Sequence, residues 1–376
     1  MSGSIKQNKQ TGKWDFIFNI AKDPMTGKRR QVRRRGFSSK REAEEEMVKL
    51  KAEVLNNEFI STSKMTYRTY MNQWFKEREF SIQESTYEMN LGYYKNIIQP
   101  RLGHLDLQQM TPVLLQNFVS NLVSEKRYSS YTIHLIFRIV SVSLKKAKIL
   151  KLIKEDPTVG ITLPKLPKKE IKVWTIEEVN FFLQESKKLD ALTRHFIAFS
   201  IAIQTGMRQG EILGLRWQDI DFENGIIYVR QTITRAAKVK SGAKNASSIR
   251  SIHIPTGLIE ELKERKQRID LERLLAGDKY QDFDLVVCTQ EGKPILPRNL
   301  RVAFHSLSDK LGLPYIRFHD LRHTHATILI QRNVNVKLIA DRLGHTDIQT
   351  TLNTYSHVIP DMQKSVAEEI AKVIVG

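Results

Sequence analysis

The first sixty residues change from an alternating pattern of apolar positions to a helical one. Trp14 to Phe18 alternates as a strand does, Arg29 to Gly36 is expected to supply another strand, and Asp23 to Gly27 between them is a turn signal. From Lys40 to Asn56 the apolar residues recur every three or four positions, as on a helix with one buried face. We therefore expect residues 1–60 to form a small three-stranded sheet that packs against one helix.

Residues 64–160 keep the helical period, and we expect them to form a helical bundle. Pro100 is expected to end the second helix, while Thr111 and Pro112 mark the start of the third. A serine pair at 129–130 then begins a fourth helix. The apolar stripes expected in the core of the bundle are Trp74, Phe75 and Phe80; Tyr87, Leu91, Tyr94, Ile97 and Ile98; Leu115, Phe118 and Leu122; and Ile133, Ile136, Val140 and Leu144.

Residues 161–172 contain a stiff, basic, proline-rich segment and are expected to link the bundle to a third domain, residues 173–376. That domain mixes helices and strands, and two alternating segments, Gly225 to Arg230 and Ser248 to Ile254, are expected to pair. Its other expected elements are a capping box at 175–178, helices at 194–204, 257–275, 298–311 and 361–374, and a strand at 283–289. We therefore expect a multidomain α+β protein that is mainly α with small β-sheets.

Charge and composition narrow the class of partner. The chain of 376 residues contains 60 Lys and Arg against 41 Asp and Glu, which gives a net charge of +19. Such an excess favours a polyanion, above all nucleic acid, through the release of counterions. No apolar run of about eighteen residues occurs and no signal peptide precedes the first domain, so we expect a cytoplasmic protein without a membrane partner. Cys288 is the only cysteine, which excludes an internal disulfide, and its apolar neighbours predict a core position.

The segment from Phe318 to His357 gathers side chains that suit phosphoryl transfer. His319 and Arg322 are three residues apart and would share one face of a helix, and His345 follows a predicted helix end. Positioned arginines and histidines can neutralise the charge that builds on the non-bridging oxygens of a phosphate. Tyr355 lies in a polar segment and is expected to be accessible, so that its phenol could attack phosphorus.

Further histidines in the same segment could suggest a metal site instead. His323 and His325 are two residues apart, so on a helix they face different ways and do not converge on one ion. We therefore expect no metal and no other cofactor.

Three long segments carry a recognisable pattern: HDLRHTHAT from His319, LGHTDIQTTLNTYSH from Leu343, and TGMRQGEILGLRW from Thr205. Together they resemble the catalytic signature of the tyrosine recombinases, the phage integrase family. The resemblance implies that DNA is cut and rejoined through a 3′-phosphotyrosyl bond. The catalytic residues that it implies are Arg208, Arg322 and His345, which hold the non-bridging oxygens, His319, which assists the tyrosine proton, and Tyr355, the nucleophile.

The resemblance also implies a catalytic lysine between the two paired strands. The family usually has Lys-Thr-x-x-Ser-x-Arg here, and Lys244 begins a segment with that spacing in which Asn245 replaces the threonine. Lys244 is our candidate for protonating the leaving 5′-oxygen. Lys240 is the alternative if the hairpin is longer. Glu211 would orient one of the arginines, or would be an ordinary first-turn carboxylate that answers the helix dipole.

The resemblance extends to the order of the domains. Residues 1–60 resemble an arm-type DNA-binding domain, with Arg33, Arg34 and Arg35 as candidate DNA contacts, and residues 64–160 resemble a SAM-like core-binding domain. The partners implied are double-stranded DNA with core-type and arm-type attachment sites, a homotetramer on that DNA, a directionality factor and a host DNA-bending protein. The organisation is most similar to integrases of temperate phages and integrative conjugative elements of Gram-positive bacteria.

Two other classes of function stay open at this point. A type IB topoisomerase shares the chemistry, although it needs no separate arm-binding module. A catalytically silent DNA-binding regulator would not need every active-site residue type that this sequence contains. The helix expected at 361–374 would dock on a neighbouring subunit or pack against its own domain.

Overall fold

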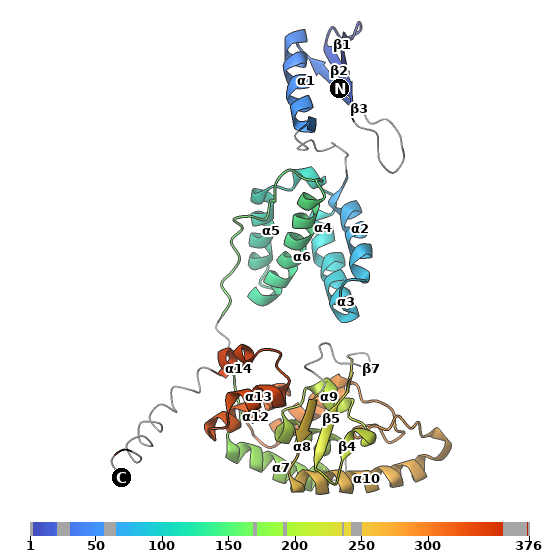
Figure 1. The fold of residues 1–376 in the computed structure, drawn as a ribbon, viewed down its shortest axis with the longest axis vertical. Coiled ribbons are helices and arrows are strands. Elements are labelled where there is room, and N and C mark those ends of the chain that lie inside the picture. The colour runs from blue at the N-terminus through green and yellow to red at the C-terminus, as the bar shows by residue number, and fades with distance from the viewer. Residues whose placement is uncertain are drawn as a thin grey trace. The chain divides into compact units, whose positions relative to one another are not determined.

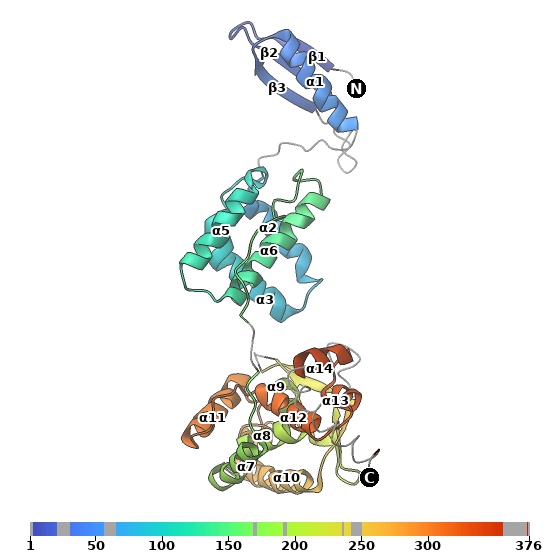
Figure 2. The same cartoon turned by 90° about the vertical axis from the view of Figure 1, so that its left-hand side faces the viewer.

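The computed structural model describes residues 3–20, 31–55, 65–167, 171–190, 194–234, 237–241, 250–355 and 374. The chain divides into two compact units, Met1–Lys168 and Lys169–Gly376, and each is described by itself. Figure 1 and Figure 2 show many helices and few, small sheets, which confirms the predicted fold class. None of the helices within the described ranges is long and apolar enough to cross a membrane.

The first unit begins with a three-stranded antiparallel sheet in the order β1 (Gly3–Gln7), β2 (Trp14–Asn19) and β3 (Gln31–Phe37). Helix α1 (Lys40–Leu55) packs on one face of this sheet (Figure 1). Phe16, Phe18 and Val32 form the core with apolar residues of α1. The predicted sheet and helix are confirmed, and the predicted turn at 23–27 lies outside the described residues.

The rest of the first unit is a helical bundle, as predicted. Its elements are α2 (Tyr67–Glu79), α3 (Glu84–Tyr93), the π-helix η1 (Tyr94–Ile98), α4 (Gln99–Leu102), the 3-10 turn η2 (Leu107–Gln109), α5 (Pro112–Ser124) and α6 (Ser130–Ile149). The expected N-caps are present, because the hydroxyls of Thr111 and Ser129 accept backbone hydrogen bonds from Leu114 and Thr132.

The prediction that Pro100 ends the second helix is wrong. The chain stays helical through α3, η1 and α4 as far as Leu102. Proline lacks an N–H and its ring crowds the carbonyl four residues earlier, so a regular α-helix does not accommodate it. Here the chain widens to the π form over Tyr94–Ile98, and the Gln99 N–H bonds to the Tyr94 carbonyl directly before the proline. This local widening accommodates Pro100 without ending the helix.

Phe80 is a second correction, since it does not belong to the core of the bundle. Its side chain is 92% exposed, whereas Trp74 and Phe75 are buried. Phe80 lies five residues after Phe75, a spacing that leaves the buried face of a helix, and α2 has already ended at Glu79.

The second unit has a mixed α/β fold, as predicted. Its helices are α7 (Ile176–Asp190), α8 (Arg194–Thr205), α9 (Gln209–Leu213), α10 (Thr256–Ala276), α11 (Pro297–Lys310), α12 (Asp320–Gln331), α13 (Val336–Leu343) and α14 (Ile348–Tyr355), with 3-10 turns η3 (Trp217–Asp219) and η5 (Gly277–Lys279). The strands β4 (Ile220–Asp221), β5 (Ile226–Val229) and β8 (Arg250–His253) form an antiparallel sheet, and β6 (Gln231–Ile233) pairs with β7 (Val239–Ser241).

The interior of this unit is organised around α8, which is buried along most of its length and contacts α7, α10, α11 and α12. The predicted pairing of β5 with β8 is confirmed. The capping box is also present, because Thr175 N–H donates to Glu178 and Glu178 N–H donates to the Thr175 hydroxyl. Cys288 is buried, as expected for a core residue.

The strand predicted from Phe283 to Thr289 is wrong. The segment is buried at Leu285–Cys288, but it pairs only through isolated bridges to Arg216 and Pro294. Asp284 has a φ of 57°, which interrupts the extended conformation that a strand needs. A short apolar run thus indicated burial correctly and secondary structure incorrectly.

Candidate active site

The N-terminal end of α12 carries two of the predicted site residues, His319 as its N-cap and Arg322 in its first turn. The turn is held by Asp320, whose carboxylate accepts hydrogen bonds from the backbone N–H and the Nε of Arg317, both at 2.8 Å. A carboxylate here also suits the positive end of the helix dipole. These contacts hold the residues on either side of Asp320 in place.

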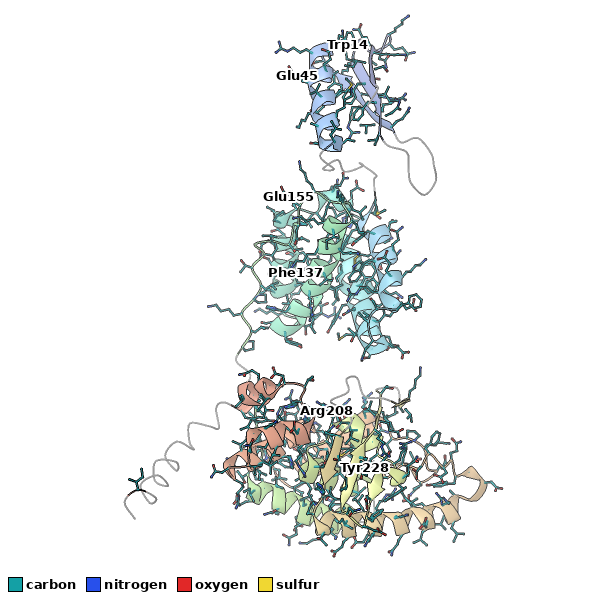
Figure 3. The ribbon with its side chains drawn as sticks, viewed as in Figure 1. Trp14, Glu45, Phe137, Glu155, Arg208 and Tyr228 are labelled. Atoms are coloured by element: carbon teal, nitrogen blue, oxygen red, sulfur yellow. The ribbon has the colours of Figure 1, made fainter. Side chains whose placement is uncertain are left out.

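Three arginines converge on the carbonyls of residues 342–344, at the C-terminal end of α13. The Arg342 carbonyl accepts from Arg250 Nε at 2.8 Å, and the Leu343 carbonyl accepts from Arg322 Nη2 at 2.7 Å. The Gly344 carbonyl accepts from Arg208 Nη2 at 2.9 Å. Carbonyls in the last turn of a helix have no partner within the helix and carry the negative end of its dipole. Guanidinium groups from β8, from α12 and from the N-cap of α9 therefore meet at one place. Figure 3 labels Arg208 in this unit.

Two glycines allow this close approach. Gly344 ends α13 in the left-handed conformation, and a Cβ there would lie 3.0 Å from Arg250 Nη1. Gly206 has a φ of 68°, and its carbonyl accepts a hydrogen bond from Arg322 Nη1 at 2.7 Å. A Cβ on Gly206 would lie 2.8 Å from the ring of His325.

Glu211 binds two of the three arginines. Its Oε1 accepts from Arg208 Nη1 at 2.9 Å, and its Oε2 accepts from Arg250 Nη2 at 2.8 Å. It also accepts the backbone N–H of Arg208, so it is a first-turn carboxylate and an arginine ligand at once. Burial raises the pKa of Glu211, but hydrogen bonding and charge from Arg250 and Arg208 outweigh burial and hold the pKa below its ordinary value.

The cluster has more positive than negative charge. Arg322 is 4% exposed, and burial together with the charge of Arg208 lowers its pKa to about 9. A guanidinium that is this strongly perturbed gains stability when an anion binds beside it. Arg208 is the more open of the two, with 38% of its side chain exposed. The site is therefore suited to a phosphate group.

Two predicted histidines lie close to these arginines. His345 follows α13, and its Nδ1 lies 2.7 Å from the Thr351 hydroxyl on α14. Burial and the charges of Arg322 and Arg208 lower the pKa of His345 to about 4. Burial and the charge of Arg322 also lower the pKa of His319. No three His, Cys, Asp or Glu side chains in the described ranges gather as metal ligands would.

Tyr355 ends α14 and is buried, so the expectation of an accessible phenol is wrong. Only 1% of the residue is exposed, and its ring packs with apolar residues of α12 and α13. Its hydroxyl lies 2.8 Å from Nδ1 of His323. Burial raises the pKa of Tyr355 to about 12, against the opposing effect of Arg322.

Two of the predictions fall outside the described residues. Lys244 lies between the described ranges, and so do residues 361–373 of the tail helix expected at 361–374. Lys240, the alternative lysine, is in β7, where its backbone is in register with Thr232 of β6.

Sequence reasoning missed two residues that the structure brings into the site, Arg250 and His323. A signal existed for both. Arg250 is the last residue of the spacing that begins at Lys244, and His323 is four residues from His319, which places both on one face of α12.

The sequence matches three family profiles in chain order. Residues 4–54 match an arm DNA-binding domain, residues 66–123 match the N-terminal SAM-like domain of phage integrases, and residues 172–361 match the phage integrase family itself.

Two curated relatives match over nearly the whole chain. A XerC-like tyrosine recombinase of Caldanaerobacter subterraneus is 30% identical, with 88% of this chain and 89% of the relative covered. The ICEBs1 integrase of Bacillus subtilis is 26% identical, with 96% and 97% covered.

Two solved structures share the fold. The Tn1549 transposon integrase in complex with a circular intermediate DNA has a TM-score of 0.68 at 21% identity, covering 81% of this chain and 99% of that one. A lambda integrase from a tetramer bound to a Holliday junction has a TM-score of 0.57 at 19% identity, covering 92% and 94%. With the family profile and the XerC-like relative, the chain is identified: it belongs to the phage integrase family of tyrosine recombinases and is a site-specific recombinase.

Proposed function

We propose that Tyr355 attacks a scissile phosphate in double-stranded DNA, which leaves a 3′-phosphotyrosyl bond and a free 5′-hydroxyl. The observation that carries this proposal is the convergence of Arg208, Arg322, His345 and Tyr355 around the C-terminal end of α13. The covalent bond retains the energy of the phosphodiester, so rejoining to another strand needs no ATP. The outcome is integration and excision of a mobile element.

Arg208 and Arg322 hold the non-bridging oxygens of the phosphate, and His345 adds a third donor. A guanidinium can donate two hydrogen bonds to phosphate oxygens at once, which suits charge that develops in the transition state. Loss of one such donor is worth about 2.7–4 kcal/mol, or roughly 10²–10³ in rate. Glu211 supports this role because it fixes the direction of Arg208.

Lys244 protonates the leaving 5′-oxygen, and His319 assists the proton of the tyrosine. Support for Lys244 comes from its spacing to Arg250, which lies beside Glu211 in the arginine cluster. Support for His319 comes from its ring, whose centroid lies 5.3 Å from that of His323, the residue in contact with Tyr355. Neither role requires a metal or another cofactor.

The domains divide the DNA between them. Residues 1–60 bind arm-type sites, residues 64–160 bind core-type sites, residues 161–172 connect the two units, and residues 173–376 perform catalysis. The arm-binding and SAM-like profile matches support the first two assignments. A homotetramer assembles on the DNA, a proposal that the solved lambda integrase tetramer on a Holliday junction supports. A directionality factor and a host DNA-bending protein complete the complex in the bacterial cytoplasm.

The experiment is a suicide substrate that is nicked beside the crossover site, incubated with the wild-type chain and with Tyr355→Phe. Wild type should be trapped as a covalent adduct, whereas Tyr355→Phe should bind the same DNA without an adduct, because only the nucleophilic oxygen is lost. Tyr315→Phe is the matched control, since Tyr315 is exposed and stacks on His305. Adduct in Tyr355→Phe would place the nucleophile elsewhere. Strand exchange that requires two paired duplexes would indicate recombination, because a topoisomerase acts on a single duplex.

A further inference from the structure

The phenol of Tyr355 is held by a histidine that the roles above do not use. His323 Nδ1 and the Tyr355 hydroxyl are 2.8 Å apart, and the two rings meet edge to face with centroids 5.7 Å apart. The apolar ring of Tyr355 packs among Ala326, Ile339 and Leu343. This packing leaves the hydroxyl as the polar end of a buried side chain, and that end contacts His323.

Burial, together with the groups around it, keeps the imidazole of His323 neutral. His319, Asp320 and Arg322 face it from α12, and Arg317 faces it from the preceding turn. His345 is close enough from the segment after α13 for the two rings to influence each other. Burial, followed by the nearby His319, lowers the pKa of His323 to about 4, although Asp320 opposes this. At neutral pH one ring nitrogen of His323 therefore carries a free lone pair.

We propose that His323 is a catalytic residue, the acceptor of the Tyr355 proton during strand cleavage. The inference rests on the proposed function of Tyr355 as the nucleophile. The phenol O–H donates to Nδ1, and the proton passes to that nitrogen as the phenolic oxygen forms its bond to phosphorus. The bond from phosphorus to the 5′-oxygen breaks, and that oxygen takes a proton from the general acid, for which Lys244 is our candidate.

Rejoining runs the same steps backwards. The 5′-hydroxyl attacks the phosphotyrosine, the phenolic oxygen leaves, and His323 returns the proton to it. A single residue thus acts as base in cleavage and as acid in rejoining, as microscopic reversibility requires.

The arriving DNA makes the proton transfer easier. Without DNA, the positive charge of Arg322 disfavours protonation of His323. A bound phosphodiester places negative charge beside Arg322. Partial neutralisation of Arg322 raises the pKa of the imidazole and so improves it as a base. His319 lies edge-on to the His323 ring and assists the tyrosine proton through it. The transfer is therefore favoured only when substrate is present.

The test compares His323→Asn and His323→Ala in the full chain on the nicked suicide substrate. Asparagine places an amide near the position of Nδ1, so it keeps a hydrogen bond to the phenol but does not act as a base. Both variants should form adduct about 10²-fold more slowly, with unchanged affinity for the DNA. A fluorinated tyrosine at position 355 has a more acidic phenol. It should raise the rate of adduct formation about tenfold more in the two variants than in wild type. A substrate with a bridging 5′-thiol should not restore them, because it bypasses only the leaving-group proton.

Three results would overturn the proposal. If His323→Asn forms adduct at the wild-type rate, His323 only positions the tyrosine. If His323→Ala forms adduct faster than wild type, His323 restrains the tyrosine. If both variants are slow and fluorotyrosine does not rescue them, His323 does not take part in proton transfer. Failure of the proposed function looks different, since wild type would then form no adduct or Tyr355→Phe would form one.

Discussion

Arg250 and Glu211 form a buried ion pair that joins β8 to α9, with Nη2 and Oε2 2.8 Å apart and 7% of each side chain exposed. The same carboxylate binds Arg208 Nη1 at 2.9 Å. One negative charge thus orients two guanidinium groups that would otherwise repel each other. With Arg322 included, the site keeps a positive excess for phosphate while its arginines stay in place.

Glu211→Ala should destabilise the second unit by about 3–5 kcal/mol, because the buried guanidinium of Arg250 loses the carboxylate that balances its charge. Urea unfolding of the full chain measures this. Glu291→Ala is the control, since it removes one half of an exposed pair with Lys293 and should leave the stability almost unchanged. Equal effects of the two variants would contradict the structural role given to Glu211.

The same carboxylate predicts a pH dependence. The folded-state pKa of Glu211 lies below its ordinary value of 4.5, so its contribution to stability is present above pH 4.5 and is lost as the pH falls through the lower folded-state pKa. Glu211→Gln removes the titrating group. The difference in unfolding free energy between wild type and Glu211→Gln should therefore shrink as the pH falls below 4.5, and a constant difference would contradict this prediction.

His325 predicts a loss of stability at a higher pH. Its Nδ1–H donates to the Ile203 carbonyl at 2.8 Å and its Nε2 accepts from Arg342 Nε at 3.1 Å, so the buried ring is neutral. Burial and the charge of Arg342 lower its pKa from 6.5 to about 4. Between these values the unfolded chain binds a proton that the folded chain does not, so stability falls with falling pH, by about 3 kcal/mol in all.

Unfolding measured from pH 7 to pH 4 tests this, with His325→Gln and the exposed control His253→Gln. The dependence of the unfolding free energy on pH should weaken in His325→Gln and persist in His253→Gln. The opposite pattern would show that another group carries the acid sensitivity.

Lys244→Ala should slow cleavage by about 10²–10⁴-fold, the usual worth of a general acid. A substrate with a 5′-thiol leaving group should rescue this variant, because a thiolate leaves without a proton. Lys240→Ala, in strand β7, is the matched comparison. Rescue of Lys240→Ala but not of Lys244→Ala would assign the role to Lys240.

Sequence patterns predicted most elements of this chain because each has a local cause. Thr111 and Ser129 cap helices through contacts three residues away, and the paired strands β5 and β8 alternate along their own length. Pro100 is different, because a proline usually ends a helix and only the π-helical turn before it, a property of the packed bundle, allows the helix to continue.

In the site, likewise, some features could be predicted from local sequence and others depend on the tertiary structure. Arg208, Arg322 and Tyr355 follow from long motifs, but the partners of these residues come from distant segments. The contact of Tyr355 with His323 spans 32 residues, and that of Arg208 with the Gly344 carbonyl spans 136. The burial of Tyr355 depends on how α12, α13 and α14 pack together, which a polar local sequence does not reveal.

The three arginines of β3 make a further prediction, because the sheet separates them by face. Arg34 is in register with Phe16, on the face that packs against α1, whereas Arg33 is in register with Ile17 on the opposite face. Arg35 shares the face of Arg33, and its side chain is 65% exposed. If this open face binds arm-type DNA, Arg33→Ala and Arg35→Ala should each weaken binding and lower the slope of log affinity against log salt by about 0.9 per lost phosphate contact.

Arg34→Ala is the matched control, since it removes the same charge from the same strand on the other face. Affinity for arm-type DNA is measured by titration at several salt concentrations, with core-type DNA as the second substrate. Arg33→Ala and Arg35→Ala should change arm binding more than Arg34→Ala does, and none of the three should change cleavage of the suicide substrate, because the proposed catalytic residues all lie in the second unit. Equal losses in all three variants would mean that net charge, rather than the open face of the sheet, determines arm binding.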